Sequence, residues 1–456
     1  MGYLIYNILL LLASPVILGV LLAKKRCRRG LPQRFGWISR ENDPSESPVV
    51  WIHAVSLGEV ITIVPFVKSL KARYPDWTFL VSTITETGRE AVEQRLADVA
   101  LHCYLPLDFP WVVEAYVRKF RPAAFVFVET ELWPNLLKCF ARHGVPTFLV
   151  NGRLSSRSYN RYRLIKGFME KVLSFVDLFL MQSDRDVQRI RDLGASSERV
   201  FRTGNMKFDQ ESQSSSISSP RITRSALGLA EHEELIVAGS THSEEEDDLL
   251  GCYTHLIREH SASILLIAPR HVERVENVET KVRAAGLVSV RRSAMNHAKG
   301  EEPKGKGPRV IILDTRGELA DVYALGRVAF VGGTLVPVGG HNLLEPARWG
   351  KPVYFGPYTD HCSEIAHLLV QAGGGIQVKD VEELSEQFLQ AFNNPSLMQR
   401  MGSAARSVVQ ANQGVMRQNL DLIVSHLEDP QHHSRLLSSS NFEVQGLKSK
   451  VQGSKV

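Results

Sequence analysis

The stretch "VVWIHAVSLGEVITIVPF" (Val49 to Phe66) contains the pattern that the rest of the chain repeats. It begins with an apolar, β-rich run, turns through Ser56 and Gly58, and continues as a helix-forming stretch. Strands that alternate with helices along a chain predict a parallel sheet with helices on both faces. Pro65 lies inside the expected helix and predicts a kink or a local break there.

The alternation occurs twice, on either side of one polar segment. The chain has 456 residues, enough for two cores of ordinary domain size. The segment "QESQSSSISSPRITRS" (Gln210 to Ser225) is serine-rich, contains a proline and predicts a linker. Expected strands before it are "VVWIHAV", "WTFLVST", "AAFVFVE", "TFLVN", "LFLMQS" and "RVFRTGN", and after it "ELIVAGS", "ILLIAPR", "RVIILDT", "VAFVGG", "KPVYFGP" and "GIQVKD". The predicted fold class is therefore α/β, with two doubly wound, Rossmann-like domains that face a cleft.

The N-terminal segment "YLIYNILLLLASPVILGVLLA" (Tyr3 to Ala23) carries no charge and is followed at once by "KKRCRR". About 20 apolar residues suffice to cross a bilayer. A signal peptide would carry its cations before the apolar run, whereas cations after it stay on the cytoplasmic side. We expect a membrane anchor helix with the rest of the chain in the cytoplasm. Asn7, Pro15 and Gly19 weaken a span, so a helix lying along the interface is the alternative.

These patterns divide the chain into parts with expected boundaries. They are a membrane anchor with its basic flank (1–30), an N-terminal domain (31–209), a linker (210–225), a C-terminal domain (226–428) and a polar tail expected to be disordered (429–456).

Charge and cysteine content limit the possible partners. The net charge of +5 and the pI near 8.9 are too weakly basic to indicate nucleic-acid binding, but they suit an acidic substrate or an anionic membrane. The cysteines are odd in number and scattered, with no metal-ligand spacing. Acidic residues fall at expected helix starts, where the helix dipole favours negative charge without a metal. These residues are Asp184, Asp186 and the run 244–248. We expect no nucleic acid, no metal and a reducing compartment.

Ligands of open α/β sheets bind beyond the carboxyl ends of strands, so a site is expected at the strand-to-helix junctions. Glu59 follows the first strand and lies three residues after Ser56. This is the spacing of a capping box, and it is also a suitable place for a general base that must reach a substrate hydroxyl. Glu129 and Glu131 follow the strand that ends at Val128, and either of them could instead bond to neighbouring backbone N–H groups.

Cations follow two later strands of the first domain. Arg153 and Arg157 open a series in "NGRLSSRSYNRYR", which could be a solvated helix face or a site for a phosphorylated acceptor. Lys207 in "GNMKFD" precedes the linker, where a cation would face the cleft.

In the second domain, "GGTLVPVGGHNLLEPARWG" (Gly332 to Gly350) concentrates glycines before a short helix. Pro346 must lie in the first turn, which puts Glu345 at the helix mouth. Asn342 and Glu345 also have capping-box spacing. A phosphate that needs close backbone approach, with a carboxylate for ribose hydroxyls, would account for the glycines as well. The loop therefore predicts a nucleotide site, to which Arg270 and Gly317 to Leu319 would add.

Several motifs together resemble one known family. They are "HAVSLGE", "VETELWPN", "NGRLSSRS", "GNMKFD", "APRH", "GEL" and "FVGGTLVPVGGHNLLEPA", in this order over roughly Arg34 to Asn412. The chain resembles the bacterial 3-deoxy-D-manno-octulosonate (Kdo) transferases. The resemblance implies a GT-B fold and an inverting transfer of Kdo from CMP-Kdo to a lipid A precursor, lipid IVA, in lipopolysaccharide core biosynthesis. It also implies attachment to the cytoplasmic side of the inner membrane and no bound metal or other cofactor.

The resemblance also assigns roles to residues of this chain. Glu59 would be the catalytic base, and Glu129 and Lys207 would assist the transition state. The N-terminal domain would bind the acceptor, with Arg153 and Arg157 as candidates, and the C-terminal domain would bind the donor. The nucleotide would lie against Pro269, Arg270, Gly317, Glu318, Leu319, Asn342, Leu343, Leu344 and Glu345.

Two other functions fit the same residues. A nucleotide-sugar epimerase or hydrolase would leave the Tyr3 to Ala23 segment and the arginine series unexplained, because it needs no lipid acceptor. A non-catalytic, membrane-tethered sugar-binding module would not depend on Glu59.

Overall fold

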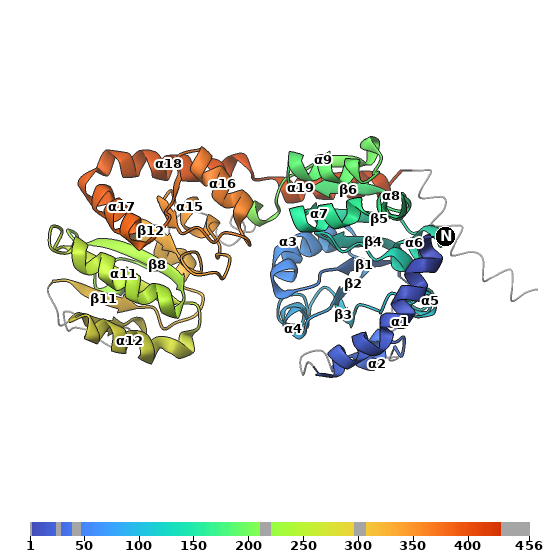
Figure 1. Ribbon diagram of the computed structural model, residues 1–456, viewed down its shortest axis with the longest axis horizontal. Helices are drawn as coiled ribbons and strands as arrows, with labels where there is room; N and C mark the ends of the chain where they lie inside the picture. Colours follow the sequence, from blue (N-terminus) through green and yellow to red (C-terminus); the bar gives the residue numbers. More distant parts are fainter. Residues whose placement is uncertain (1, 24–28, 39–46, 210–219, 296–306, 430–456) are drawn as a thin grey trace, which may run out of the picture. The chain divides into compact units, whose positions relative to one another are not determined.

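The computed structural model describes residues 2–23, 29–38, 47–209, 220–295 and 307–429. The chain divides into two compact units (Figure 1). The first unit comprises Met1–Gln210 and Gly414–Val456, and the second comprises Glu211–Gln413. The expected tail (429–456), apart from Asp429, and most of the expected linker lie outside the described residues.

Within its described residues the first unit contains a parallel sheet of seven strands in the order β3-β2-β1-β4-β5-β6-β7. The chain builds outward from β1 to β3 and then returns to β4 on the other side of β1. The strand order therefore reverses between β1 and β4, which defines the topological switch point. The strands are β1 Val49–His53, β2 Thr78–Thr83, β3 Leu101–Tyr104, β4 Pro122–Val128, β5 Thr147–Gly152, β6 Leu178–Met181 and β7 Val200–Arg202.

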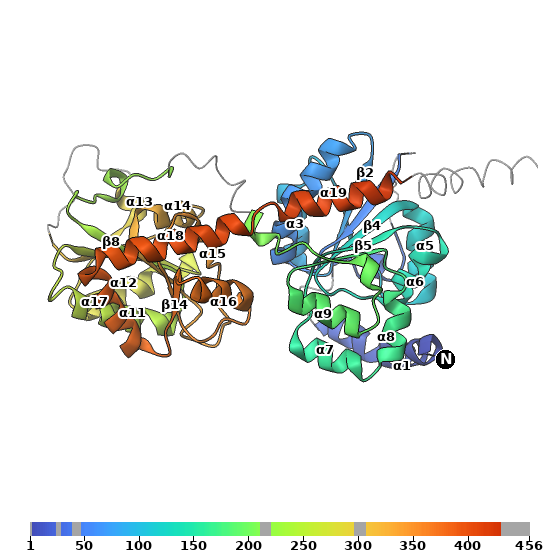
Figure 2. The same ribbon diagram turned by 90° about the horizontal axis from the view of Figure 1, so that it is seen from above.

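Helices cover both faces of this sheet because both faces of its strands are apolar. Val49 and Trp51 of β1 enter one core, with α5, α6, α8 and α9, while Val50 and Ile52 enter the other, with α3, α4 and α19 (Figures 1 and 2). The helices of this unit are α1 Gly2–Ala23, α2 Leu31–Arg34, α3 Leu57–Arg73, α4 Glu86–Arg95, α5 Pro110–Phe120, α6 Pro134–Arg142, α7 Ser156–Arg163, α8 Lys166–Leu173, α9 Asp184–Asp192 and α19 Val415–Leu427. Helix α3 continues through Pro65, so the expected local break does not occur.

The second unit has the same architecture. Its described residues form a parallel sheet of seven strands in the order β10-β11-β9-β8-β12-β13-β14, with the switch point between β8 and β12. The strands are β8 Glu234–Thr241, β9 Ser263–Pro269, β10 Val288–Arg291, β11 Arg309–Ile312, β12 Gly326–Val331, β13 Val353–Phe355 and β14 Gly375–Gln377. The helices are α11 Ser243–Leu256, α12 Val275–Ala284, α13 Arg292–Met295, α14 Leu319–Val322, α15 Leu344–Arg348, α16 Ser363–Gln371, α17 Val381–Asn393 and α18 Pro395–Ala411. The predicted class, α/β with two doubly wound sheets, is confirmed.

The structure differs from the sequence predictions at the second domain's end. The predicted boundary at 428 assigns α19 to the C-terminal domain, but α19 belongs to the first unit. Its residues Val415, Ile423 and Leu427 are buried in the same core as Val60 of α3, and Figure 2 shows α19 running beside α3. The buried carboxylate of Asp209 accepts hydrogen bonds from the backbone N–H groups of Gly414 and Met416, which fixes the start of α19.

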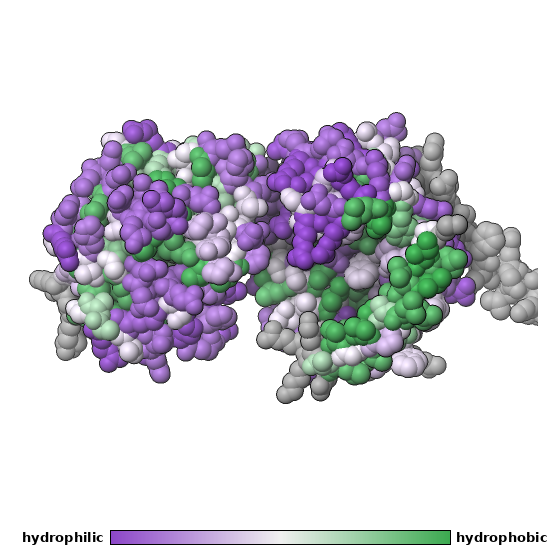
Figure 3. Space-filling view, viewed as in Figure 1, coloured by the Kyte–Doolittle hydropathy of each residue, from purple (hydrophilic) through white to green (hydrophobic). Residues whose placement is uncertain are grey.

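Helix α1 packs on the first unit through one side only. The Tyr3 hydroxyl donates to the Pro134 carbonyl at 3.0 Å, and the Tyr6 hydroxyl donates to the Asp108 carboxylate at 2.8 Å. The other side is exposed and apolar, and Figure 3 shows it as a hydrophobic band on the surface. Among the described residues, α1 is the one helix that is long and apolar enough to cross a membrane by length and composition.

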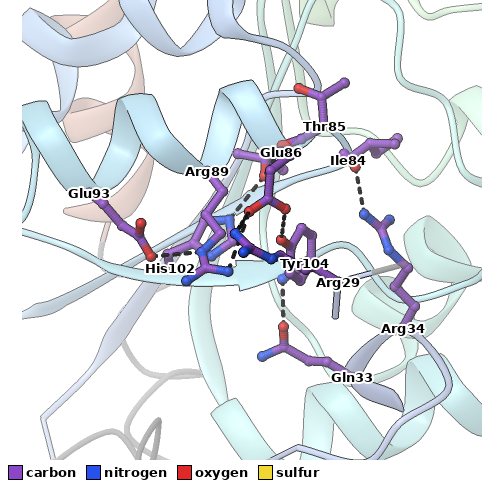
Figure 4. Close-up of polar contacts among 11 residues, drawn as sticks. Arg29, Gln33, Arg34, Ile84, Thr85, Glu86, Arg89, Glu93, His102 and Tyr104 are labelled. Atoms are coloured by element: carbon purple, nitrogen blue, oxygen red, sulfur yellow. Dashed lines mark hydrogen bonds and ion pairs between the residues drawn. The ribbon is translucent and has the colours of Figure 1, made fainter. Parts of the chain in front are cut away.

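A polar network fastens the segment that follows α1 to the carboxyl edge of the first sheet (Figure 4). Glu86, at the start of α4, accepts from Arg29 at 3.2 Å and from the Tyr104 hydroxyl. The Gln33 side-chain oxygen accepts from the Tyr104 backbone N–H at 3.0 Å, and the Arg34 guanidinium donates to the Ile84 carbonyl. The chain leaving the apolar helix is thus held at the edge where strands β2 and β3 end.

Candidate active site

Three carboxylates meet at the switch point of the first sheet. Glu59 lies in the first turn of α3, just after β1, and Glu129 and Glu131 follow β4. All three side chains are partly buried, and the charges of Glu129 and Glu131 both act on Glu59. The crevice at a switch point is where open α/β sheets bind their ligands. The three carboxylates therefore lie at the edge of the first sheet where a ligand is expected.

Glu59 is held by local hydrogen bonds, and no cation in the described ranges of the chain pairs with it. Its Oε2 accepts from the Val55 backbone N–H at 2.8 Å, and its Oε1 accepts from the Ser56 hydroxyl at 3.1 Å. These bonds differ from a capping box, in which the carboxylate would bond to the Ser56 backbone N–H. Burial, reinforced by the charges of Glu129 and Glu131, raises the pKa of Glu59 to about 7. A carboxylate with this pKa is a competent general base near neutral pH.

The backbone at Glu129 is in an unusual conformation. Its φ is +59°, in the left-handed region that side chains other than Gly, Asn and Asp rarely adopt. Its N–H donates to the Val150 carbonyl at 3.1 Å, so the turn is fixed by neighbouring strand β5. Strained backbone of this kind is often retained at functional sites.

Glu131 has a partner of its own. The Trp133 indole N–H donates to its carboxylate at 3.1 Å, while burial and then the charge of Glu129 raise its pKa. Thr130, between the two glutamates, turns its hydroxyl to the Arg153 carbonyl.

A buried amide network, which the sequence analysis missed, lies where β5, β6 and β7 end. Asn151 has a φ of +53° and accepts from the Met206 N–H at 3.0 Å. Gln182 donates to the Asn151 carbonyl at 2.9 Å and accepts from Asn205 at 3.1 Å. The Asn205 side-chain oxygen accepts from the Lys207 N–H at 3.0 Å. The network therefore positions Lys207, and the sequence signal was an amide at the end of each strand.

Lys207 is partly buried and makes no ion pair with any residue in the described part of the chain. Arg153 is partly buried beside Thr130, whereas Arg157 is exposed on α7. Two further arginines that the sequence analysis did not single out, Arg185 and Arg189, donate to the Ser156 hydroxyl at 2.8 Å each. The start of α7 is thus surrounded by guanidinium groups.

The predicted nucleotide residues of the second unit follow β9, β11 and β12. Pro269 ends β9, and the exposed Arg270 follows it with its N–H donating to the Thr241 carbonyl at 3.0 Å. Gly317 has a φ of +85° and open space where a side chain would lie. The Glu318 carboxylate forms an ion pair with the Arg292 guanidinium at 3.2 Å. Leu319 begins α14.

The predicted helix mouth at α15 is found where expected. Leu344 begins α15, Leu343 precedes it, and Pro346 lies in the first turn. The Asn342 side-chain oxygen accepts from the Leu344 N–H at 3.1 Å, and its amide donates to Glu345 at 3.3 Å. Asn342 and Glu345 therefore contact each other, but they do not form the capping box that their spacing allowed, because Leu343 is the N-cap residue of α15 and makes no side-chain cap bond.

The glycines of the loop after β12 have a structural reason that the sequence did not reveal. A Cβ at Gly332 would lie 2.5 Å from the Ser240 carbonyl oxygen, and one at Gly339 would lie 2.9 Å from the His361 ring. The buried carboxylate of Glu245 accepts from the N–H groups of His242, Gly333, Thr334 and Leu335 at 2.8 to 3.0 Å. Close packing on β8 and α11 thus requires bare backbone here, so the glycines alone do not demand a phosphate.

One cluster in the described residues has the side chains and spacing of a metal site, and it lies away from these junctions. Glu114 of α5 lies near Cys139 and His143 at the end of α6. Glu114 already pairs with Arg118 at 2.7 Å and with His143 at 3.1 Å, and a cation in that place competes with a metal ion. Asp186 is used structurally, because it accepts from the Leu154 N–H at 2.7 Å.

Comparison with known proteins supplies the family. Residues 29–210 match the family described as 3-deoxy-D-manno-octulosonic-acid transferase (kdotransferase). A 3-deoxy-D-manno-octulosonic acid transferase of Haemophilus influenzae is 33% identical over 429 residues, covering 93% of this chain and 98% of that protein. One of Chlamydia pneumoniae is 31% identical over 410 residues, covering 88% and 90%.

One solved structure with a similar fold is the UDP-GlcNAc 2-epimerase of Neisseria meningitidis. It has a TM-score of 0.56 and 13% identity, and the match covers 84% of this chain and 100% of that one. At this identity the likeness concerns the fold alone, which is GT-B-like.

Proposed function

Because the chain belongs to the 3-deoxy-D-manno-octulosonic acid transferase family, we propose that it is an inverting glycosyltransferase that moves Kdo from CMP-Kdo to a lipid A precursor. The first unit holds the acceptor, lipid IVA, and the second holds the donor. The observation that carries this proposal is the Glu59 carboxylate at the first switch point, whose pKa burial raises to about 7.

In this reaction Glu59 takes the proton from an acceptor hydroxyl as that oxygen attacks the anomeric carbon of Kdo. The bond from this carbon to the CMP phosphate breaks on the opposite face, and the configuration inverts. Glu129 stabilises the positive character that develops on the sugar, and Lys207 supplies a cation close to the developing charge. Residues Val55 and Ser56 hold the Glu59 carboxylate in place for proton transfer.

The donor's nucleotide lies against residues of the second unit. The Arg270 guanidinium meets the phosphate, and the Asn342 to Glu345 segment holds the ribose and base. Pro269 and Gly317 to Leu319 complete this surface, where Gly317 leaves room for close approach. No metal ion takes part in this proposal, since cations of the chain meet the leaving phosphate.

The acceptor is a lipid, and the exposed apolar side of α1 suits a protein that works at a membrane. The cations that follow α1 favour the cytoplasmic side of the inner membrane. Arg153 and Arg157 at the start of α7 bind the acidic groups of the acceptor.

A transfer assay with CMP-Kdo and lipid IVA, with products identified by mass spectrometry, tests the proposal. Glu59→Gln should lower kcat by about 10²- to 10⁴-fold, while CMP binding measured by calorimetry stays unchanged. Glu90→Gln, an exposed carboxylate of α4, is the matched control and should retain full turnover. Full turnover by the Glu59→Gln protein would rule out this base.

The same assay separates the other functions. Consumption of CMP-Kdo without an acceptor indicates a hydrolase or epimerase, a class whose fold the chain shares. A sugar-binding module gives no turnover at all. Activity that a chelator abolishes and Mg²⁺ restores would contradict the metal-free reaction.

Glu345→Ala should weaken CMP binding, measured by calorimetry, and an unchanged affinity would assign Glu345 to local hydrogen bonding only.

A further inference from the structure

Two histidines that are 99 residues apart in sequence lie in direct contact in the second unit. The Nε2 atoms of His242 and His341 are 2.9 Å apart, and the rings are nearly parallel, with an angle of 2° between their planes. His242 follows β8 and His341 lies in the loop after β12, so the pair sits at the switch point of this sheet. Their sequence spacing gave no indication of this contact.

The contact limits how many protons the pair can hold. A hydrogen bond between two ring nitrogens needs one ring to donate and the other to accept. With both rings neutral, each carries one proton and the bond is satisfied. The His242 side chain also accepts from the Glu245 backbone N–H in a capping box at the start of α11, and its outer nitrogen makes this bond because Nε2 faces His341. One further proton can be added to the outer nitrogen of the donor ring without breaking the ring-to-ring bond, but at His242 this proton displaces the cap, and a second proton cannot be added to the accepting Nε2. The pair therefore has two states that keep the ring-to-ring bond and differ by a single proton.

The surroundings hold the pair neutral. Burial, followed by the charges of Arg270, His242, His361 and His271, lowers the pKa of His341 to about 4. Burial also lowers the pKa of His242, with His271, Arg274 and Arg270 acting in the same direction.

The carboxylates nearby are already used. Glu245 is the acidic group whose charge opposes these effects at His242, but it accepts four backbone hydrogen bonds. Glu246 is buried and forms a bidentate ion pair with Arg274. Arg270 has no carboxylate partner in the part of the chain that the structure describes. A cation and a protonatable pair thus face the carboxyl ends of β8, β9 and β12 without a neutralising anion.

We propose that Arg270 and the His242–His341 pair form the site for the nucleotide phosphate, and that the pair takes up one proton from solvent when this phosphate binds. The inference rests on the proposed function, because it concerns how that same nucleotide is held. A phosphate supplies the missing negative charge, which favours the protonated state of the pair. The phosphate gains charge as it leaves the sugar, so the imidazolium and Arg270 neutralise it together. His242 and His341 are binding residues in this account, and Glu59 remains the base.

Calorimetric titration of the full chain with CMP, in buffers of different ionisation enthalpy at about pH 7.5, measures the protons taken up. CMP itself is almost fully ionised there, because its second pKa is about 6, and its own contribution is equal in all variants. The wild-type protein should take up about 0.1 to 0.3 proton per CMP, as expected if the phosphate charge raises the pKa of the pair from about 4 to near 7. His242→Asn and His341→Asn should each lose most of this uptake and bind CMP about tenfold more weakly.

His255→Asn provides the matched control, since His255 lies at the far end of α11 and bonds to Ser385. It should match the wild-type uptake and affinity. The proposal is wrong if the wild-type protein binds CMP without uptake, or if both asparagine variants at 242 and 341 keep the full uptake. The wild-type measurement decides the matter even if a variant fails to fold. Failure of the wild-type protein to bind CMP at all would overturn the proposed function, and this inference with it.

Discussion

At the scale of single residues, Glu59 is distinguished by its like-charged neighbours and by the lack of a cation partner among the residues that the structure describes. Val55 and Ser56 donate hydrogen bonds to its carboxylate, which favour ionisation, yet burial and the charges of Glu129 and Glu131 oppose it more strongly. The pKa of the proposed base therefore lies near neutral pH, and its neighbours determine this value.

The neighbours of Glu59 should control the pH dependence of transfer. Since the base must be ionised, kcat/KM should fall as the pH is lowered through about 7. Glu129→Gln and Glu131→Gln each remove a negative charge, so each should move this acidic limb to lower pH, by about 0.5 to 1 pH unit for Glu129→Gln. Only Glu129→Gln should also lower the value of kcat/KM on the plateau above this limb. A limb that moves to higher pH in either variant would contradict this arrangement.

Glu59 should also cost stability at high pH. Its pKa in the folded protein is above the unfolded value, so its protonated form favours folding and that contribution is lost as pH rises through about 7. Glu59→Gln cannot ionise, so the variant should gain stability relative to wild type as pH rises from about 5 to 8, by about 1–3 kcal/mol. Unfolding in urea across this pH range measures the difference. A difference that does not change with pH would mean that the carboxyl is not perturbed by folding.

At the scale of elements, the loop after β12 depends on one buried side chain. Glu245 satisfies four backbone N–H groups of the loop and of its own helix start. Helix α11 thus determines the shape of a segment that lies about 90 residues later in the sequence.

Glu245→Gln should therefore destabilise the protein by about 2–4 kcal/mol, because an amide has one acceptor oxygen and brings two donors against N–H groups. Amide hydrogen exchange of Gly333 to Leu335 should accelerate as well. Glu244→Gln, an exposed residue of the same helical turn, is the control and should change neither quantity. Unchanged exchange in the Glu245→Gln protein would show that the loop is held by its packing alone.

The elements that the sequence analysis missed have a common physical cause. Strands β3 and β10 are both edge strands, and their first residues are exposed or half-buried. An edge strand covered on only part of its surface lacks the continuous apolar run by which the inner strands were found. "LHCY" and "VSVR" consequently resemble loop segments when only the sequence is considered.

At the scale of the whole molecule, the chain's order does not coincide with its units. After forming the second sheet, the chain returns so that α19 completes a core of the first unit.

Ile423→Ala should therefore destabilise the first unit by about 2–4 kcal/mol. Hydrogen exchange should rise in peptides from β1 and β4 but not in those from β8 and β9. Arg417→Ala, on the exposed side of α19, is the control. Faster exchange in the second sheet instead would assign α19 to that unit.

The sequence by itself determined the α/β class, the two sheets, the apolar N-terminal helix and the strand ends at which Glu59, Glu129, Arg270 and Asn342 to Glu345 lie. These features follow from local periodicity and from the residue types at strand-to-helix junctions. Both depend only on residues that are close together in the sequence. The tertiary structure alone decided the placement of α19, the Glu245 contacts with the loop after β12, and the meeting of His242 with His341. Each of these joins residues far apart in the chain, and such contacts depend on how whole elements pack, which no local pattern specifies.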